Sequence, residues 1–79
     1  MIGYKVIKKV LYNDDIGKYD SYGICAYADK DENFIKLIYI PDVFLDKEQA
    51  HKFANDCNKF QLDIIHLYDA IYDTLEEAI

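Results

Sequence analysis

The spacing of the apolar residues changes at Pro41, and this change limits the fold more than any other feature of the chain. Before Pro41, apolar and polar residues mostly alternate, which is typical of strands that bury one face. After Pro41, apolar residues recur at intervals of three and four, which is typical of helices that bury one side. A chain of 79 residues has room for one domain. The sequence therefore predicts a single small α+β domain over residues 1–79, with strands first and helices last.

Two strands are expected before residue 30. The first, IGYKVIKKVLY, places these apolar residues on one face: Ile2, Tyr4, Val6, Val10 and Tyr12. Its other face carries Gly3, Lys5 and Lys9. The second, KYDSYGICAYA, alternates two sets of residues, namely Tyr22, Ile24, Ala26 and Ala28 against Tyr19, Ser21, Gly23, Cys25 and Tyr27. The polar stretch NDDIG between them predicts a turn.

A third strand, FIKLIYI, is expected to end at Pro41. Because it is almost continuously apolar, we expect both of its faces to be covered. The polar stretch DKDEN precedes it and predicts a second hairpin turn. Short connections of this kind favour a three-stranded antiparallel meander.

Two helices are expected after Pro41, which gives the order β-β-β-α-α in two layers. Asp46 is a good N-cap for the first, whose apolar residues are Ala50, Phe53, Ala54 and Cys57. This helix is expected to end near Asn58, with Asn58 as a left-handed C-terminal cap. The second helix follows Asp63 and runs toward Ala78. Its apolar side covers about 160° of the helix, more than one core contact needs, and either helix could lie directly on the sheet.

The chain is acidic, with a net charge of −6. Residues 1–40 hold six lysines and six acids, whereas residues 41–79 hold three lysines and nine acids. An acidic surface disfavours duplex nucleic acid and anionic membranes. All nine basic residues are lysines, so the bidentate guanidinium contact to phosphate or guanine is absent from this sequence. With neither an 18-residue apolar run nor a secretion signal, the sequence predicts a cytoplasmic protein without a membrane partner.

Cys25 and Cys57 both stand within apolar patterns and outside any CxxC pair. We expect two buried free thiols, with one disulfide as the alternative. Together with His51 and His66 they match no zinc-ligand spacing. The sequence therefore predicts no metal site of this kind.

One polar cluster has residue types that could form a catalytic or metal site. On a helix, His66, Asp69 and Asp73 fall within one narrow arc, but that arc lies opposite the apolar side, so we expect a solvated helix surface. The stretch DKDEN begins like a calcium loop but has Phe34 and Ile40 where such a loop needs Gly and Glu. No sequence motif of a known catalytic site is present. We therefore expect no enzymatic activity, no catalytic residue, no metal and no cofactor.

The eight tyrosines are the unusual feature of the composition. Tyrosine combines a large apolar body with a polar tip and is common in protein interfaces. The leading hypothesis is a protein-interaction or regulatory module that forms a homodimer or binds a protein partner. Its expected surface is formed by Tyr19, Tyr27, Ile65, Tyr72 and Ile79. The alternative is a binder of small ligands or single-stranded nucleic acid, in which Tyr19 and Tyr27 act beside Lys5 and Lys9.

Two stretches, YGICAY and CNKFQLDIIHLYDAIYD, resemble a domain-of-unknown-function family of very short proteins from Gram-positive anaerobes. The residues that carry the resemblance are Tyr22, Gly23, Ile24, Cys57, Asn58, Leu62, Asp63, His66, Leu67 and Asp69. The similarity covers most of the chain. It implies no established activity. For the second stretch it implies a capped corner between two helices, with Asp63 as the cap.

Overall fold

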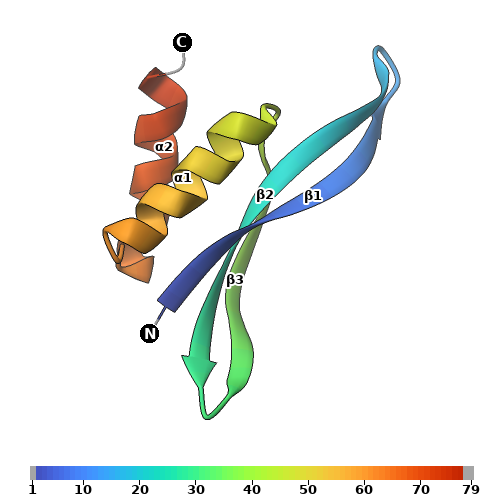
Figure 1. Ribbon diagram of the computed structural model, residues 1–79. Coiled ribbons are helices and arrows are strands. Elements are labelled where there is room, and N and C mark those ends of the chain that lie inside the picture. Colours follow the sequence, from blue (N-terminus) through green and yellow to red (C-terminus); the bar gives the residue numbers. More distant parts are fainter. Residues whose placement is uncertain (1, 78–79) are drawn as a thin grey trace.

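The chain folds into a three-stranded antiparallel sheet with two helices on one of its faces (Figure 1). The computed structural model describes residues 2–77. In chain order the elements are β1 (Ile2–Asn13), β2 (Gly17–Lys30), β3 (Asn33–Phe44), α1 (Lys47–Lys59), a 3-10 turn η1 (Ile64–His66) and α2 (Leu67–Glu77). The strand order β1-β2-β3 is that of a meander. The predicted α+β arrangement of three strands followed by two helices is confirmed.

The core lies between the sheet and α1, which contacts all three strands. Asp46 caps this helix by accepting a hydrogen bond from the Glu48 backbone N–H, as predicted. The predicted apolar side of α1 is buried: Ala50, Phe53, Ala54 and Cys57. Two of these residues are alanines, so the helix axis can approach the strands closely. α2 lies beside α1 in the helical layer (Figure 1), and its buried residues Leu67 and Ile71 join the same core.

The β1–β2 hairpin is longer than the helical layer above it. β1 and β2 remain paired as far as Asn13 and Gly17, whereas the last pair between β2 and β3 is Tyr22 with Phe44. Residues 10–20 therefore form a two-stranded arm that extends away from the helices (Figure 1). Val10 and Tyr12 follow the predicted alternation but are 60% and 70% exposed, because no helix reaches the arm.

The third strand differs from its prediction in both extent and burial. It continues through Pro41 to Phe44, which is tolerated because β3 is an edge strand and needs no hydrogen bond on its outer side. A bulge at Pro41–Val43 shifts its register against β2, and a second bulge lies at Leu37. The expected cover on both faces is wrong, since Phe34, Ile35 and Leu37 are exposed.

Asn58 does not cap α1 as predicted but binds the edge of the sheet. Its Oδ1 accepts a hydrogen bond from the Tyr4 backbone N–H, and its Nδ2 donates to the Tyr4 carbonyl, both at 2.8 Å. The Tyr4 hydroxyl in turn donates to the Leu62 carbonyl at 2.7 Å. The helix ends one residue later, at Lys59, and Gln61 takes the left-handed conformation, with φ of 51°. Asn58 thus joins the corner between the helices to β1.

The second helical segment begins after Asp63, as predicted, but its first turn is η1. Asp63 accepts a hydrogen bond from the Ile65 backbone N–H at 3.3 Å. Leu67 and Ile71 of α2 are buried, while three large residues remain exposed: Ile65 at 75%, Tyr68 at 52% and Tyr72 at 64%. Part of the wide apolar side inferred from the sequence therefore faces away from the core.

Replacing Asn58 by alanine is expected to lower the free energy of unfolding by about 1 to 3 kcal/mol, because the variant leaves a backbone donor and acceptor of Tyr4 without their partners. Urea unfolding measures this change. The matched control is Asn55→Ala, at an exposed position of the same helix. Equal effects of the two substitutions would contradict the proposed role of Asn58.

Candidate functional site

The face of the sheet opposite the helices carries a shallow depression of about 320 Å³. We call its lining the lysine–tyrosine face, which consists of Lys5, Ile7, Lys9, Cys25, Tyr27, Phe34, Lys36 and Tyr39. All three strands contribute to it. It is the candidate site because its residue types and charge differ from those of the remaining surface.

The register of the strands brings these residues together. Lys5 of β1 and Tyr39 of β3 both pair with Cys25 of β2, so one row crosses the whole sheet. Tyr27 pairs with Gly3 on one side and with Lys36 on the other. Two adjacent rows thus place lysines and tyrosines on one face, because side chains of directly paired residues point to the same side of a sheet.

Two glycines make room for the tyrosine rings. A Cβ atom on Gly3 would lie 2.5 Å from the ring of Tyr27, so this ring rests over the glycine. A Cβ atom on Gly23 would lie 2.9 Å from the ring of Tyr39 and 2.7 Å from the Ile40 carbonyl oxygen. The aromatic side chains can therefore lie low over the central strand. Cys25 is accordingly buried, although it is on the face without helices.

Lysine side chains lie over both tyrosine rings. The Lys5 Nζ is 5.7 Å from the centre of the Tyr27 ring, and the Lys9 Nζ is 5.0 Å from that of Tyr39. These distances are those of cation–π contacts, which attract the ammonium to the ring face. Phe34 meets Tyr27 edge to face, with ring centres 5.4 Å apart. The contacts hold ammonium groups beside an apolar floor.

The depression is positively charged in an acidic protein. Among residues 2–77, three lysines and no carboxylate line it, whereas residues 41–79, which supply both helices, hold all of the net charge of −6. The excess negative charge therefore lies in the part of the chain that forms the helices, whereas the three lysines of the depression lie on the sheet. A surface of this kind favours a negatively charged ligand.

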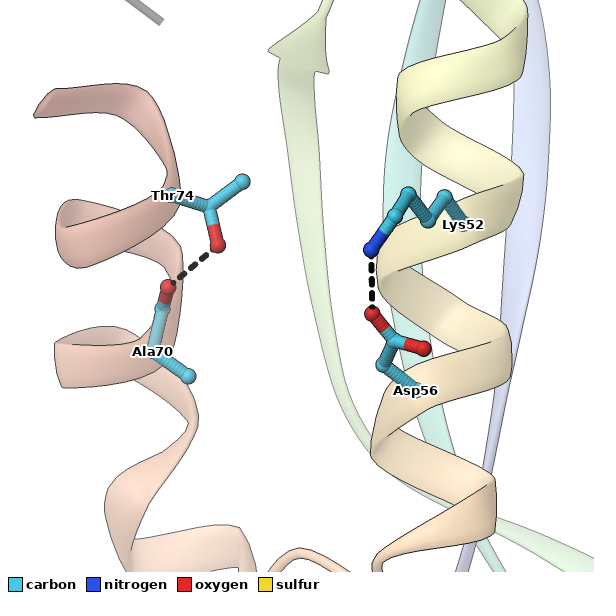
Figure 2. Close-up of polar contacts among 4 residues, drawn as sticks. All are labelled: Lys52, Asp56, Ala70 and Thr74. Carbon is cyan, nitrogen blue, oxygen red and sulfur yellow. Dashed lines mark hydrogen bonds and ion pairs between the residues drawn. The ribbon is translucent and has the colours of Figure 1, made fainter. Parts of the chain in front are cut away.

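A second depression lies between α1 and α2, and three of its polar side chains are already paired. Figure 2 shows Lys52 and Asp56 on α1 facing Ala70 and Thr74 on α2. Lys52 Nζ lies 2.9 Å from Asp56 Oδ2, and Thr74 Oγ1 donates to the Ala70 carbonyl at 2.9 Å. Each of these contacts stays within one helix. The lining also contains the polar side chains of Gln49 and Glu77.

The thiol of Cys57 also lines this second depression. Burial raises the pKa of Cys57 to about 11, and the negative charge of Asp56 adds to the effect. The thiol is therefore protonated near neutral pH. Because the thiolate is the reactive form of cysteine, Cys57 is not activated as a nucleophile.

Three groups of residues were weighed from the sequence as catalytic or metal sites. His66, Asp69 and Asp73 are exposed, as expected for a solvated helix surface. Among residues 2–77, His, Cys, Asp and Glu nowhere gather in a group of three or more that could hold a metal ion. Cys25 and Cys57 are free and buried, as predicted. DKDEN forms the β2–β3 hairpin turn, with Asp31 and Glu32 at positive φ.

The residues of the expected interaction surface lie in different parts of the molecule. Tyr27 is in the lysine–tyrosine face. Tyr19 is half-buried in the arm, opposite Leu11, and is not part of the depression. Ile65 and Tyr72 are exposed in the helical layer, and Ile79 lies outside the described residues. The expected set therefore does not form one continuous surface.

Three residues of the face were missed from the sequence: Phe34, Lys36 and Tyr39. All three belong to β3, where the bulge at Leu37 changes which residues share a face. Simple alternation would put Phe34 and Lys36 on the side opposite Tyr39. Lys36, the lysine within the apolar run of β3, was the indication in the sequence that one side of this strand is exposed to solvent.

Comparison with known proteins identifies no matching family model, curated protein or solved structure. The resemblance described above therefore stays a prediction. Several residues that carry it have structural roles at the helix corner: Cys57 and Leu67 are buried, Asn58 binds Tyr4, and Asp63 caps η1. Within residues 2–77 no helix has the length and apolar character required to cross a membrane.

Replacing Gly3 by alanine is expected to displace the ring of Tyr27, because the new methyl group would overlap the ring. In proton NMR spectra the upfield shift that this ring produces in the side-chain methylene signals of Lys5 should then decrease. Lys9, which lies over Tyr39, is the internal control and should keep its shifts. Unchanged Lys5 signals would contradict this packing of Tyr27 over Gly3.

Proposed function

We propose that this protein is a non-enzymatic interaction module that binds a protein partner through the lysine–tyrosine face. One observation carries the proposal: on the uncovered side of the sheet, the described residues that line the depression combine three lysines with an aromatic floor and include no carboxylate. Aromatic residues are enriched where proteins bind each other. The free thiols Cys25 and Cys57 are compatible with a reducing, cytoplasmic setting for such a module.

A protein partner fits the face better than a single-stranded nucleic acid. Bases bind by stacking on open aromatic faces, but Lys5 and Lys9 lie over the rings of Tyr27 and Tyr39. The net charge of −6 also repels a long polyanion, which carries a negative charge at every nucleotide. A protein segment can bring a few carboxylates together with apolar side chains.

Selection of random displayed peptides on the immobilised protein tests this function. The enriched peptides should bind Lys9→Glu at least about tenfold more weakly than the unmodified chain, because the substitution reverses a charge in the face. The matched control is Lys18→Glu, which makes the same charge change at an exposed position of the arm. Full binding is expected for this control.

Two results would refute the function. One is enrichment of peptides whose binding is equal for the two variants, which would place the interaction elsewhere. The other is Lys9-dependent retention of single-stranded oligonucleotides without any Lys9-dependent peptide, which would favour the nucleic-acid alternative.

Self-association is a second candidate, and a different surface favours it. Two lysine–tyrosine faces would bring Lys5, Lys9 and Lys36 of two copies together, which is unfavourable. In contrast, Ile65, Tyr68 and Tyr72 expose large apolar groups at positions i, i+3 and i+7 of the last helical segment. We propose that a homodimer forms by contact between these stripes.

Light scattering over a concentration series tests the homodimer. We expect the mass of a dimer at high protein concentration and the mass of a monomer for Tyr72→Asp, because a charge would be buried in the contact. Tyr12→Asp is the matched control, since Tyr12 is 70% exposed and Tyr72 is 64% exposed. A monomer at every concentration would exclude the homodimer.

A further inference from the structure

The lysines of β1 stand in a row that has the repeat of an extended chain. Lys5, Ile7 and Lys9 alternate along one strand and all line the depression. Neighbouring positions of such a row are about 7 Å apart, so the two lysine Cα atoms are separated by about 13 Å. Positions i, i+2 and i+4 of an extended ligand have the same spacing.

The third lysine makes the two ends of this row different. Lys36 pairs with Tyr27, which pairs with Gly3, so Lys36 lies on the opposite edge strand, one row from Lys5 and three rows from Lys9. Two lysines of the lining, Lys5 and Lys36, therefore lie toward one end of the row. The third, Lys9, lies at the other end. A ligand with two separated negative charges would meet positive charge at both ends.

The middle of the depression is apolar. Ile7 lies between the two lysines of β1 and pairs with Gly23, over which the ring of Tyr39 rests. An apolar side chain placed there would bury area on Ile7 and on the ring of Tyr39. Packing of this kind is favourable by about 25 cal/mol per Å² of apolar surface removed from water.

We propose that the lysine–tyrosine face binds an extended acidic protein segment with the pattern acid-x-apolar-x-acid. The two acidic side chains pair with the lysines at the ends of the row, and the apolar side chain between them packs on Ile7 and Tyr39. The inference rests on the proposed function and adds the chemistry and conformation of the partner. The charge of the lining and the two-residue repeat of its row carry it.

Synthetic peptides capped at both ends test the pattern. The probe has glutamate at positions two and six, phenylalanine at position four, and serine or threonine elsewhere. One control replaces both glutamates with glutamine, and another has the same composition with the two glutamates adjacent. Titration calorimetry of the full chain at low and high salt gives the dissociation constants.

We expect the probe to bind at least about tenfold more tightly than either control, and to bind less tightly as salt increases, because exposed ion pairs are screened. Lys9→Glu should weaken probe binding to a similar extent, and Lys18→Glu should leave it unchanged. Binding by Lys9→Glu should return with a probe in which one glutamate is replaced by lysine. Restored binding would show that residue 9 of the protein contacts the substituted position of the peptide.

Other outcomes overturn the inference and separate it from the proposed function. If the glutamine control binds as tightly as the probe and its binding depends on Tyr27, the face binds protein but does not select acids. If the adjacent-glutamate control binds as tightly as the probe, charge alone matters and the extended pattern is wrong. If none of the peptides binds, the pattern is wrong as well, and the displayed-peptide selection still decides the function independently.

Discussion

The pair of hydrogen bonds between Asn58 and Tyr4 fixes how the two layers of this protein meet. It joins residues 54 positions apart in the sequence, at the end of α1 and near the start of β1. The Tyr4 ring extends into the core, and its hydroxyl reaches Leu62 in the loop after α1. One residue of the first strand therefore positions both the end of α1, through its backbone, and the loop that leads to α2, through its side chain.

The same contact also affects the use of the sheet. The outward-facing backbone groups of Tyr4 are bound to Asn58, so β1 does not offer a continuous free edge to another strand. On the other edge, Pro41 and two bulges interrupt β3. Because addition of a strand is obstructed at both edges and helices cover one face, the remaining face is the part of the sheet that is open to a partner. This is the face that carries the lysines and tyrosines.

Hydropathy patterns predict the layers of this fold but not the tertiary contacts that complete it. The alternation of apolar and polar residues correctly predicts that Tyr4, Ile24 and Ala26 face the core, because in this part of the sheet the apolar face is the one that the helices cover. It does not reveal that Val10 lies beyond the helices, because burial depends on how far α1 reaches. The role of Asn58 also depends on a distant backbone, so its local sequence suggested only a helix cap.

The candidate face was predictable in part. Lys5, Lys9 and Tyr27 were placed together because β1 and β2 pair without irregularity. Tyr19 lies outside the depression, since alternation assigns a side of the sheet but not a position along it. Lys36 and Tyr39 were missed because the bulge at Leu37 shifts the alternation of β3, and bulges have no reliable local pattern.

The two-stranded arm implies that stability is unevenly distributed within this small chain. A hairpin without a third strand or a helix to cover it is marginally stable, so residues 10–20 can open locally while the rest remains folded. The lysine–tyrosine face lies elsewhere, on strands whose opposite side carries the fully buried Ile24 and Ala26. A ligand bound to this face contacts residues that folding has already ordered, and little of its binding free energy is lost in ordering the protein.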